Sequence, residues 1–338
     1  MYRIIKKECV EIVDNIDFSQ LKDKSILVTG ASGLVGVYMV SCLKEIKEKY
    51  NLKITCWVKN DLEYPLNEIF KDCQIIQSDI TNSESFNKLP KYDCIIHAAG
   101  YGQPVKFLEN KIKTISLNTN STINLFDKLN DGGKFLFVST SELYSGLDVE
   151  SIDESQIGTT NTDHPRSCYI EGKRCGESIC HSYAKQGVDV KIIRLSLAYG
   201  PGTKMGDHRV LNSLIEKGLK NNDITLMDRG EAIRTYCYIT DVVEMFWKIL
   251  LFGKSTVYNV GGDSITTIYD LAKSIGKILG KEVKIPSEIK GMEGNPKMVN
   301  ISTKTYTNEF GGIKFKPLTY GLNNTIKWQK ELYEKYYV

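Results

Sequence analysis

The chain has 338 residues, which is enough for one large domain, or for a main and a smaller domain around a sizeable core. Its 44 Lys and Arg residues nearly balance 41 Asp and Glu residues, so neither nucleic acid nor an anionic membrane is favoured as a partner. The nine cysteines form no CxxC pair, which predicts reduced thiols in a cytoplasmic protein, without a disulfide framework or a metal site.

The first residues, MYRIIKKECVEIVDNIDF, mix charged and apolar side chains. This pattern is neither that of a signal peptide nor that of a membrane span. It predicts an amphipathic helix that lies on the first domain, as part of an N-terminal helical extension over residues 1–24.

The stretch ILVTGASGLVG, residues 26–36, runs from three apolar residues into three glycines. An apolar segment at helical spacing follows, so the stretch predicts a buried strand, a tight loop and a helix start. Such a loop brings a pyrophosphate close to backbone N–H groups at a helix N-terminus, although a merely structural turn is the alternative. The loop residues expected to bind a dinucleotide are Gly30, Ser32, Gly33, Leu34, Val35 and Gly36.

Further apolar runs predict strands at residues 53–58, 73–77, 94–98, 135–138 and 190–195, with helical patterns at 104–129 and 169–185. Strands that alternate with helices imply parallel pairing and hence an α/β fold with a doubly wound, Rossmann-type sheet. Beyond residue 200 the segments become short and mixed, which predicts a smaller mixed C-terminal domain. We expect a dinucleotide-binding domain at 25–200, with a strand and a helix returning from about 235–260, and a substrate-binding domain at 201–338.

The end of the second predicted strand bears on which dinucleotide is bound. Rossmann sites usually place an acidic residue there for the ribose hydroxyls, whereas a cation suits a 2′-phosphate. This chain has Lys59, and Asp61 reaches the ribose only if the turn curls back. A solvated Lys59 is the simpler interpretation, so the residues alone leave NAD and NADP both open.

Tyr169 and Lys173 lie four residues apart in a helical segment and therefore project from one face. An ammonium beside a phenol is expected to lower the pKa of the phenol and make it a usable base. The alternative is an ordinary surface pair. Hydroxyl and carboxyl side chains at residues 139–144 follow a buried strand, at the sheet edge where ligands bind in open α/β folds.

In these residues the chain resembles the extended short-chain dehydrogenase/reductase family, specifically its nucleotide-sugar epimerases, dehydratases and decarboxylases. The resemblance covers most of residues 25–260. It rests on the glycine loop, Asp79-Ile80, His97-Ala98-Ala99, Asn118, the stretch 139–144, Tyr169 with Lys173, and Tyr199-Gly200-Pro201.

The resemblance implies a catalytic triad of Thr140, Tyr169 and Lys173, in which Tyr169 takes a proton from a sugar hydroxyl while hydride leaves the same carbon for NAD. It also implies cofactor contacts beyond the glycine loop, from Asp79, Ile80, Ala98, Ala99, Gly100, Asn118, Tyr169 and Lys173. Lys59, at the end of the second strand, is a further candidate for a cofactor contact. Structural interpretations remain open for Asp79 as a helix cap and Asn118 as a buried amide. For His97 we prefer a strand-end histidine satisfied by the backbone.

Ser141-Glu142 resembles the pattern of UDP-glucuronate decarboxylases, as does the segment from Pro165 to Arg174. By that resemblance Ser141, Glu142 and Arg234 act on the sugar ring after oxidation at C4, although a backbone contact for Glu142 and a surface ion pair for Arg234 are the alternatives. Tyr101 and Arg209 join Ser141, Glu142 and Arg234 as expected substrate-binding residues. Leu197 stands where similar enzymes have Asn, so one polar contact to the nucleotide diphosphate is missing.

The first hypothesis is an NAD-dependent enzyme that oxidises a nucleotide sugar at C4 and then decarboxylates, epimerises or dehydrates it, in surface-polysaccharide biosynthesis. A C4 dehydrogenase that releases the 4-keto product is the second hypothesis. A non-catalytic cofactor-binding scaffold is the third, and it predicts a lost Tyr or Lys. The resemblance further implies a homodimer built from a four-helix bundle.

Overall fold

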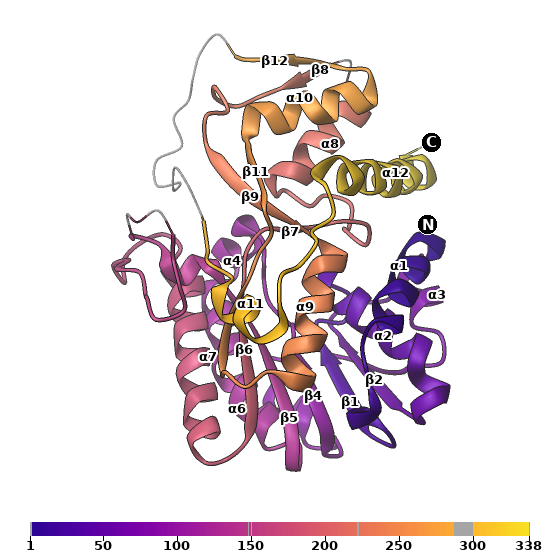
Figure 1. Ribbon diagram of the computed structural model, residues 1–338, viewed down its shortest axis with the longest axis vertical. Coiled ribbons are helices and arrows are strands. Elements are labelled where there is room, and N and C mark those ends of the chain that lie inside the picture. Colours follow the sequence, from indigo (N-terminus) through magenta and orange to yellow (C-terminus); the bar gives the residue numbers. More distant parts are fainter. Residues whose placement is uncertain (1, 148, 150, 222, 287–299, 338) are drawn as a thin grey trace.

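The main sheet sets the architecture of the molecule (Figure 1). The computed structural model describes residues 2–147, 149, 151–221, 223–286 and 300–337. Within them, seven parallel strands pair in the order β10-β6-β5-β4-β1-β2-β3. Their bounds are β1 (Ser25–Thr29), β2 (Lys53–Val58), β3 (Gln74–Gln77), β4 (Tyr92–His97), β5 (Leu129–Thr140), β6 (Asp189–Leu195) and β10 (Val257–Val260). The strand order reverses between β1 and β4, which confirms the predicted doubly wound sheet. In such sheets the ligand-binding crevice lies at this switch point, outside the carboxyl ends of the strands.

Helices cover both faces of this sheet because successive side chains of a strand point to opposite sides. Ile26 and Val28 of β1 belong to a core cluster with residues of α1, α2 and α9, whereas Leu27 belongs to a cluster with residues of α5, α6 and α7. The helices are α1 (Tyr2–Asp14), α2 (Leu34–Tyr50), α3 (Leu66–Ile69), α4 (Pro104–Glu109), α5 (Lys111–Asn118), α6 (Asn120–Phe126), α7 (Ser167–Lys185), α8 (Val210–Lys220), α9 (Ile239–Phe252), α10 (Ile268–Leu279), α11 (Lys304–Phe310) and α12 (Leu318–Tyr337), with 3₁₀ turns η1 (Ser19–Leu21), η2 (Ser83–Phe86) and η3 (Ser141–Tyr144).

Two small sheets lie beyond the carboxyl ends of the main strands (Figure 1). One has the order β11-β9-β7 and the other pairs β12 with β8. Their bounds are β7 (Ala198–Tyr199), β8 (Asp223–Thr225), β9 (Ile233–Tyr238), β11 (Ser264–Thr267) and β12 (Glu282–Lys284). The segment expected to return at about 235–260 is divided between the two parts, since α9 and β10 join the main unit while β9 pairs antiparallel with β11.

The continuous helix predicted over residues 104–129 is wrong. The segment forms α4, α5 and α6, and residue 129 already starts β5. The breaks fall at Asn110 and Thr119, whose backbones leave the helical region. Their side chains bond to backbone carbonyls four residues earlier, those of Lys106 and Ile115. Such local bonds compete with regular helix geometry, which explains the interruptions.

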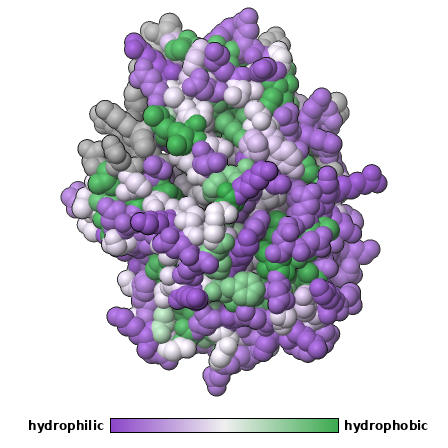
Figure 2. All heavy atoms as spheres, viewed as in Figure 1, coloured by the Kyte–Doolittle hydropathy of each residue, from purple (hydrophilic) through white to green (hydrophobic). Residues whose placement is uncertain are grey.

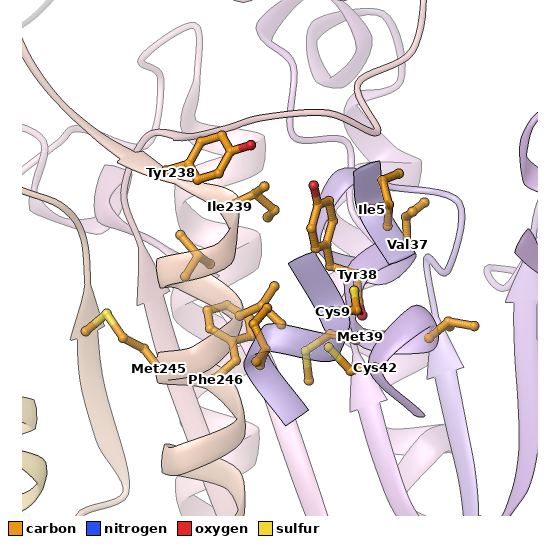
Figure 3. Packing of buried hydrophobic residues seen from close by; sticks show 14 of the residues in the cluster. Ile5, Cys9, Val37, Tyr38, Met39, Cys42, Tyr238, Ile239, Met245 and Phe246 are labelled. Atoms are coloured by element: carbon orange, nitrogen blue, oxygen red, sulfur yellow. Dashed lines mark hydrogen bonds between the residues drawn. The ribbon is translucent and has the colours of Figure 1, made fainter. Parts of the chain in front are cut away.

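The N-terminal helix α1 is part of the core. Ile5, Cys9 and Ile12 are buried against α2 and α9, and Figure 3 shows Ile5 and Cys9 facing this packing. Glu8 on the same helix is buried too, and its carboxylate accepts hydrogen bonds of 2.6 Å each from the hydroxyls of Tyr38 and Tyr238. Burial raises the pKa of Glu8. One carboxylate therefore joins α1 to α2 and to the end of β9.

Hydrophilic side chains predominate on the face drawn in Figure 2, where hydrophobic ones occur in small separate groups. In the described part of the chain, every helix is too short or too polar to cross a membrane. The described ranges also hold no group of three His, Cys, Asp or Glu side chains placed to share a metal ion.

Candidate active site

The glycine loop lies between β1 and α2 and is packed so closely that two of its positions admit no side chain. Gly30 has a φ of +64°, and a Cβ there would lie 2.6 Å from the backbone of Ala98 and Ala99. A Cβ on Gly36 would lie 2.4 Å from the carbonyl oxygen of Gly30. The loop is thereby pressed against the end of β4, as a Rossmann dinucleotide site requires.

Gly33 is the N-cap of α2, and no side chain caps this end of the helix. The N–H groups of the first turn, which begins with Leu34 and Val35, therefore point out of the helix without an intrahelical partner. Ser32 lies beside them, and its hydroxyl is 3.2 Å from the ammonium of Lys204. Open N–H groups at a helix start together with an ammonium form a cradle that fits a dinucleotide pyrophosphate.

Lys204 follows β7 and reaches the loop from 172 residues further along the chain, so no sequence pattern pointed to it. Burial lowers the pKa of Lys204, and the nearby charge of Lys106 lowers it further. Two cations close together are electrostatically costly unless an anion joins them. Their position favours an anionic ligand.

The far end of the crevice holds the residues expected on the adenine side. Asp79 is paired with Lys59 at 3.2 Å and with Lys113 at 3.1 Å, and Lys59 also donates to the hydroxyl of Tyr101 at 2.9 Å. Burial alone raises the pKa of Asp79, but bonds from Thr81 and both lysines lower it overall. Lys59 is thus paired with a carboxylate, and its contact with a cofactor phosphate stays a prediction.

The structure gives the protein contacts of three further residues at this end. Asp79 does not cap η2, because Asn82 is the N-cap and its side chain accepts from Glu84 N–H. Asp61 accepts a bond of 2.8 Å from Gln77 at the end of β3. Ile80 is buried in the core cluster that contains Leu27, and its carbonyl accepts from Ser121.

His97 is a structural histidine, as preferred from the sequence. Its ring contacts the hydroxyl of Thr29 at 2.8 Å and the carbonyl of Leu117 at 3.3 Å. Burial lowers the pKa of His97 to about 3, so the ring stays neutral. The hydroxyl of Thr29 also accepts from the N–H of Ala99, which fixes the strand end beside the glycine loop.

Asn118 is fully buried at the end of α5. Its amide nitrogen donates to Thr114 O at 2.7 Å, while its Oδ1 has no hydrogen-bond partner among the described residues. A Cβ on Gly176 of α7 would lie 2.7 Å from the carbonyl of Asn118. Asn118 therefore joins α5 to α7 and keeps one acceptor for a ligand group.

Thr140, Tyr169 and Lys173 come together at the carboxyl ends of β4 and β5. The Lys173 ammonium donates to Val138 O at 2.6 Å and lies 4.7 Å from the centre of the Phe137 ring. It also lies 3.8 Å from where a Cβ on Gly100 would stand, at the end of β4. The spacing predicted from the sequence thus places the lysine beside the cofactor crevice.

The sequence predicts that the pKa of Tyr169 is lowered, and this prediction is wrong. Burial of the phenol and the nearby charge of Glu142 raise the pKa of Tyr169 to about 12, while a hydrogen bond with Thr140 lowers it. The charges of Arg166 and Arg209 lower it too. Lys173 points to the β5 backbone, and its own burial lowers its pKa to about 7.

Ser141 and Glu142 lie in η3, directly after Thr140. Thr140 is the N-cap of this turn, and its hydroxyl accepts from Glu142 N–H at 3.2 Å. The Glu142 carboxylate is paired with the guanidinium of Arg166, and not with the backbone donor considered from the sequence. Burial raises the pKa of Glu142 and the charge of Arg166 lowers it.

Three guanidinium groups converge on this region. Arg209 is paired with the buried carboxylate of Asp207, with Arg209 Nη2 and Asp207 Oδ2 2.5 Å apart. Arg234 lies on β9 and donates to Ile233 O at 2.7 Å. Burial lowers the pKa of Arg234, and the charge of Arg166 contributes in the same direction. A gathering of cations next to a phenol and a carboxylate favours an anionic substrate.

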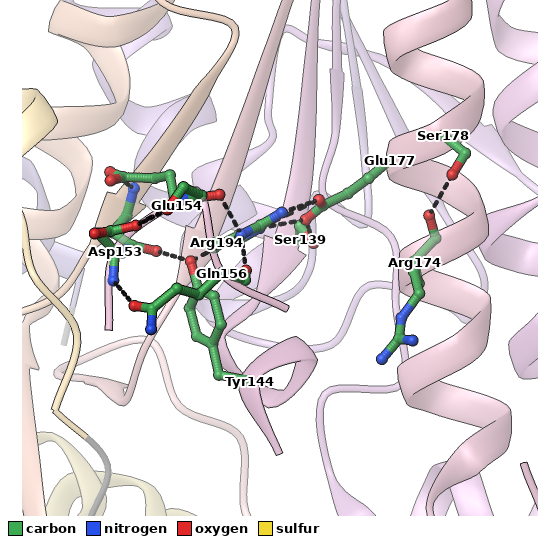
Figure 4. A network of polar contacts seen from close by, with 11 residues as sticks. Ser139, Tyr144, Asp153, Glu154, Gln156, Arg174, Glu177, Ser178 and Arg194 are labelled. Atoms are coloured by element: carbon green, nitrogen blue, oxygen red, sulfur yellow. Dashed lines mark hydrogen bonds and ion pairs between the residues drawn. The ribbon is translucent and has the colours of Figure 1, made fainter. Parts of the chain in front are cut away.

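A buried ion pair between β6 and α7 lies next to η3 (Figure 4). The guanidinium of Arg194 on β6 binds the carboxylate of Glu177 on α7 at 2.8 Å, and both side chains are 5% exposed. Ser139 donates to Glu177, and Arg194 also donates to the hydroxyl of Tyr144 at 2.9 Å. The backbone carbonyls of Glu154 and Gln156 accept from the same guanidinium. This network fixes both flanks of η3.

Comparison with known proteins gives one consistent result. A model of the NAD dependent epimerase/dehydratase family matches residues 26–261. UDP-glucuronic acid decarboxylase 1 of Xenopus tropicalis is 29% identical over 326 residues, covering 94% of this chain and 75% of that protein. Among solved structures, a dTDP-glucose 4,6-dehydratase of Streptomyces venezuelae with NAD bound has a TM-score of 0.78 at 21% identity and covers 93% of this chain and 99% of its own. A UDP-glucose 4-epimerase of Thermotoga maritima has a TM-score of 0.76 at 22% identity, with 91% and 99% covered.

Proposed function

Because this chain belongs to the NAD dependent epimerase/dehydratase family, we propose that it oxidises a nucleotide sugar at C4, with Tyr169 as the base. Its cofactor is NAD, in keeping with that family. The single observation that carries the proposal is the hydrogen bond between Thr140 and Tyr169, with Lys173 one helical turn further along α7.

NAD, when bound, accepts the hydride from C4 and can return it to the sugar. The chain itself has three tasks in this oxidation. The cradle at the start of α2 holds the pyrophosphate, Tyr169 takes the proton from the C4 hydroxyl, and Thr140 hydrogen-bonds the same oxygen. Lys173, at the crevice wall, is placed to hold the nicotinamide ribose.

The second step is proposed to be decarboxylation. In a uronic acid sugar, a ketone at C4 stands β to the carboxylate on C5, so the C5–carboxylate bond breaks, CO₂ leaves, and the electron pair moves into the carbonyl. Ser141, Glu142 and Arg234 are proposed to handle the proton that C5 then takes up. The decarboxylase relatives favour this outcome over epimerisation or dehydration.

The experiment that tests the function is an assay of the purified protein with a panel of UDP-, GDP-, CDP- and dTDP-sugars, together with mass spectrometry of what copurifies. Release of CO₂ and a pentose nucleotide from a UDP-hexuronate is the expected result. Net NADH equal to the product in single turnover would instead favour a C4 dehydrogenase that releases the 4-keto sugar. An absence of turnover with every sugar contradicts the proposal.

Lys204 is expected to contribute to NAD binding, because its ammonium lies at the pyrophosphate cradle. Lys204→Ala should weaken NAD binding by about tenfold, the usual size for one charged hydrogen bond. Isothermal titration calorimetry measures the effect, and high salt should reduce the difference. Lys277→Ala, an exposed lysine on α10, is the matched control and should bind NAD as the unmodified protein does. Equal affinities for both variants would contradict the role of Lys204.

We also propose that the protein is a homodimer through the helices on the α5 and α7 side. Ile112 of α5 is 79% exposed, Ile115 is 39% exposed, and Ile123 of α6 is 42% exposed. Apolar side chains grouped on an outer helical face favour burial against a partner.

The dimer is tested by light scattering at micromolar concentration. Ile112→Lys should convert a dimer into a monomer, because an ammonium would be buried in an apolar contact. Ile265→Lys on β11, at a position that is 62% exposed, is the matched control and should leave the mass unchanged. A monomeric unmodified protein would refute the dimer.

Two broader expectations remain proposals. A cytoplasmic location is supported by the nine cysteines, which are free thiols. A role in surface-polysaccharide sugar biosynthesis is supported by the likeness of Asp207-His208-Arg209-Val210 and the Arg234 segment to proteins of such pathways. Product identity and cell fractionation test them.

A further inference from the structure

We propose that Arg166 is a positioning residue that fixes the Glu142 carboxylate and, through Phe107, the ring of Tyr169. This inference rests on the proposed function. The Arg166 guanidinium is paired with Glu142 Oε1, and its central carbon lies 5.5 Å from the centre of the Phe107 ring. The Phe107 ring stacks on the Tyr169 ring at 4.7 Å with an interplanar angle of 3°. One guanidinium thereby links η3, α4 and α7.

The backbone strengthens this link. Arg166 is the N-cap of α7, and its carbonyl accepts from the N–H of Tyr169 at 3.0 Å. The side chain of Arg166 thus contacts the partner of the tyrosine ring, while its main chain fixes the tyrosine backbone. Arg166 therefore contacts both the carboxylate of Glu142 and the backbone of Tyr169.

The Arg166–Glu142 pair differs from an ordinary structural ion pair, because two of its polar atoms have no hydrogen-bond partner among the described residues. Glu142 Oε2 and Arg166 Nε are buried and have no hydrogen-bond partner among the described residues. Buried structural pairs normally satisfy their remaining atoms, because each unsatisfied atom is costly. These two atoms lie in the site region and are left for a bound group.

The guanidinium also sets the charge of Glu142. Burial raises the pKa of this carboxyl, and Arg166 is the group that lowers it. Other charged or titratable groups around the site are Tyr169 on α7, Arg209 before α8, and Arg234 and Tyr236 on β9, with Asp228 near Arg234. His164 lies before α7, and its ring accepts a hydrogen bond from the backbone N–H of Arg166. Without Arg166 the carboxyl should therefore be protonated at a higher pH.

Tyr169 and Glu142 serve different steps of the proposed reaction, so two measurements separate their contributions. Oxidation at C4 depends on Tyr169 and is followed by NADH absorbance in single turnover. Release of CO₂ depends in addition on Glu142 and is followed over pH. Arg166→Gln should lower CO₂ release at pH 6 by about 30-fold or more and move the acid limb of its pH profile to higher pH. C4 oxidation should fall by only about threefold, because the main-chain carbonyl of residue 166 still accepts from the N–H of Tyr169.

Three companion variants sharpen the test. Arg166→Lys keeps the charge and should return the acid limb toward its original pH, although it loses the flat contact with Phe107. Phe107→Leu should lower C4 oxidation without moving the acid limb, because the Glu142 pair stays intact. Glu142→Gln should remove the acid limb in both the unmodified and the Arg166→Gln background.

The opposite results are equally definite. An unchanged pH profile in Arg166→Gln, or equal losses in both steps, would overturn the positioning role and leave Arg166 as a structural residue. If Arg166→Gln does not fold, as judged by circular dichroism, the Arg166→Lys and Phe107→Leu profiles decide alone. A protein that oxidises no nucleotide sugar at all would refute the proposed function, whereas normal turnover with unchanged variants would refute only this inference.

Discussion

Tyr169→Phe is expected to lower turnover by roughly 10³-fold, within the range usual for a general base. The phenol is buried and is hydrogen-bonded with Thr140. The phenyl ring of the variant keeps the stack on Phe107, so the fold and the site shape should persist. NAD affinity should stay within about twofold, because the pyrophosphate cradle lies at the start of α2.

Steady-state turnover and calorimetric NAD binding check this result together. Tyr92→Phe is the matched control, since Tyr92 is buried in the core at the start of β4, at the end of the strand opposite to the site. That variant should retain full turnover. Full activity in Tyr169→Phe would refute the assignment of the base, and loss of folding would show in the thermal transition.

Arg194→Met is expected to have the largest effect on stability, lowering the free energy of unfolding by about 3–5 kcal/mol. The reason is that Glu177 would stay buried without its partner, and the carbonyls of Glu154 and Gln156 would lose their donor. Denaturant unfolding of the unmodified and variant proteins gives this difference.

The double variant Arg194→Met with Glu177→Leu distinguishes the cause. Removing both charges should recover part of the loss, because no unpaired charge remains buried. A single variant within about 1 kcal/mol of the unmodified protein would contradict the importance of the pair, since exposed pairs typically give that value.

Much of the fold could be predicted because its signals are local. The apolar run before Gly30 and the spacing to Gly36 both report short-range sterics, and the doubly wound sheet follows from strands that alternate with helices. The breaks at Asn110 and Thr119 were missed because they arise from side-chain bonds to the backbone, which compete with an otherwise helical pattern.

The site was predictable to a lesser extent. Tyr169 and Lys173 share a helix face, and that much follows from spacing. The direction in which the Lys173 ammonium points does not follow from spacing, and the structure shows it donating to Val138 O on β5. Lys204 and Arg166 act through contacts that bring distant segments together, so their roles became visible only in three dimensions.

The shared carboxylate of Glu8 changes where the protein can be divided. Two phenols from separate parts of the chain end on this one group, and Asn324 of α12 donates to it as well at 3.3 Å. Removal of the residues before β1 would therefore leave the hydroxyls of Tyr38 and Tyr238 and the amide of Asn324 without their shared acceptor. Helix α1 therefore connects the two parts of the enzyme. A fragment that starts at residue 25 would lack Glu8 and the hydrogen bonds that hold these parts together.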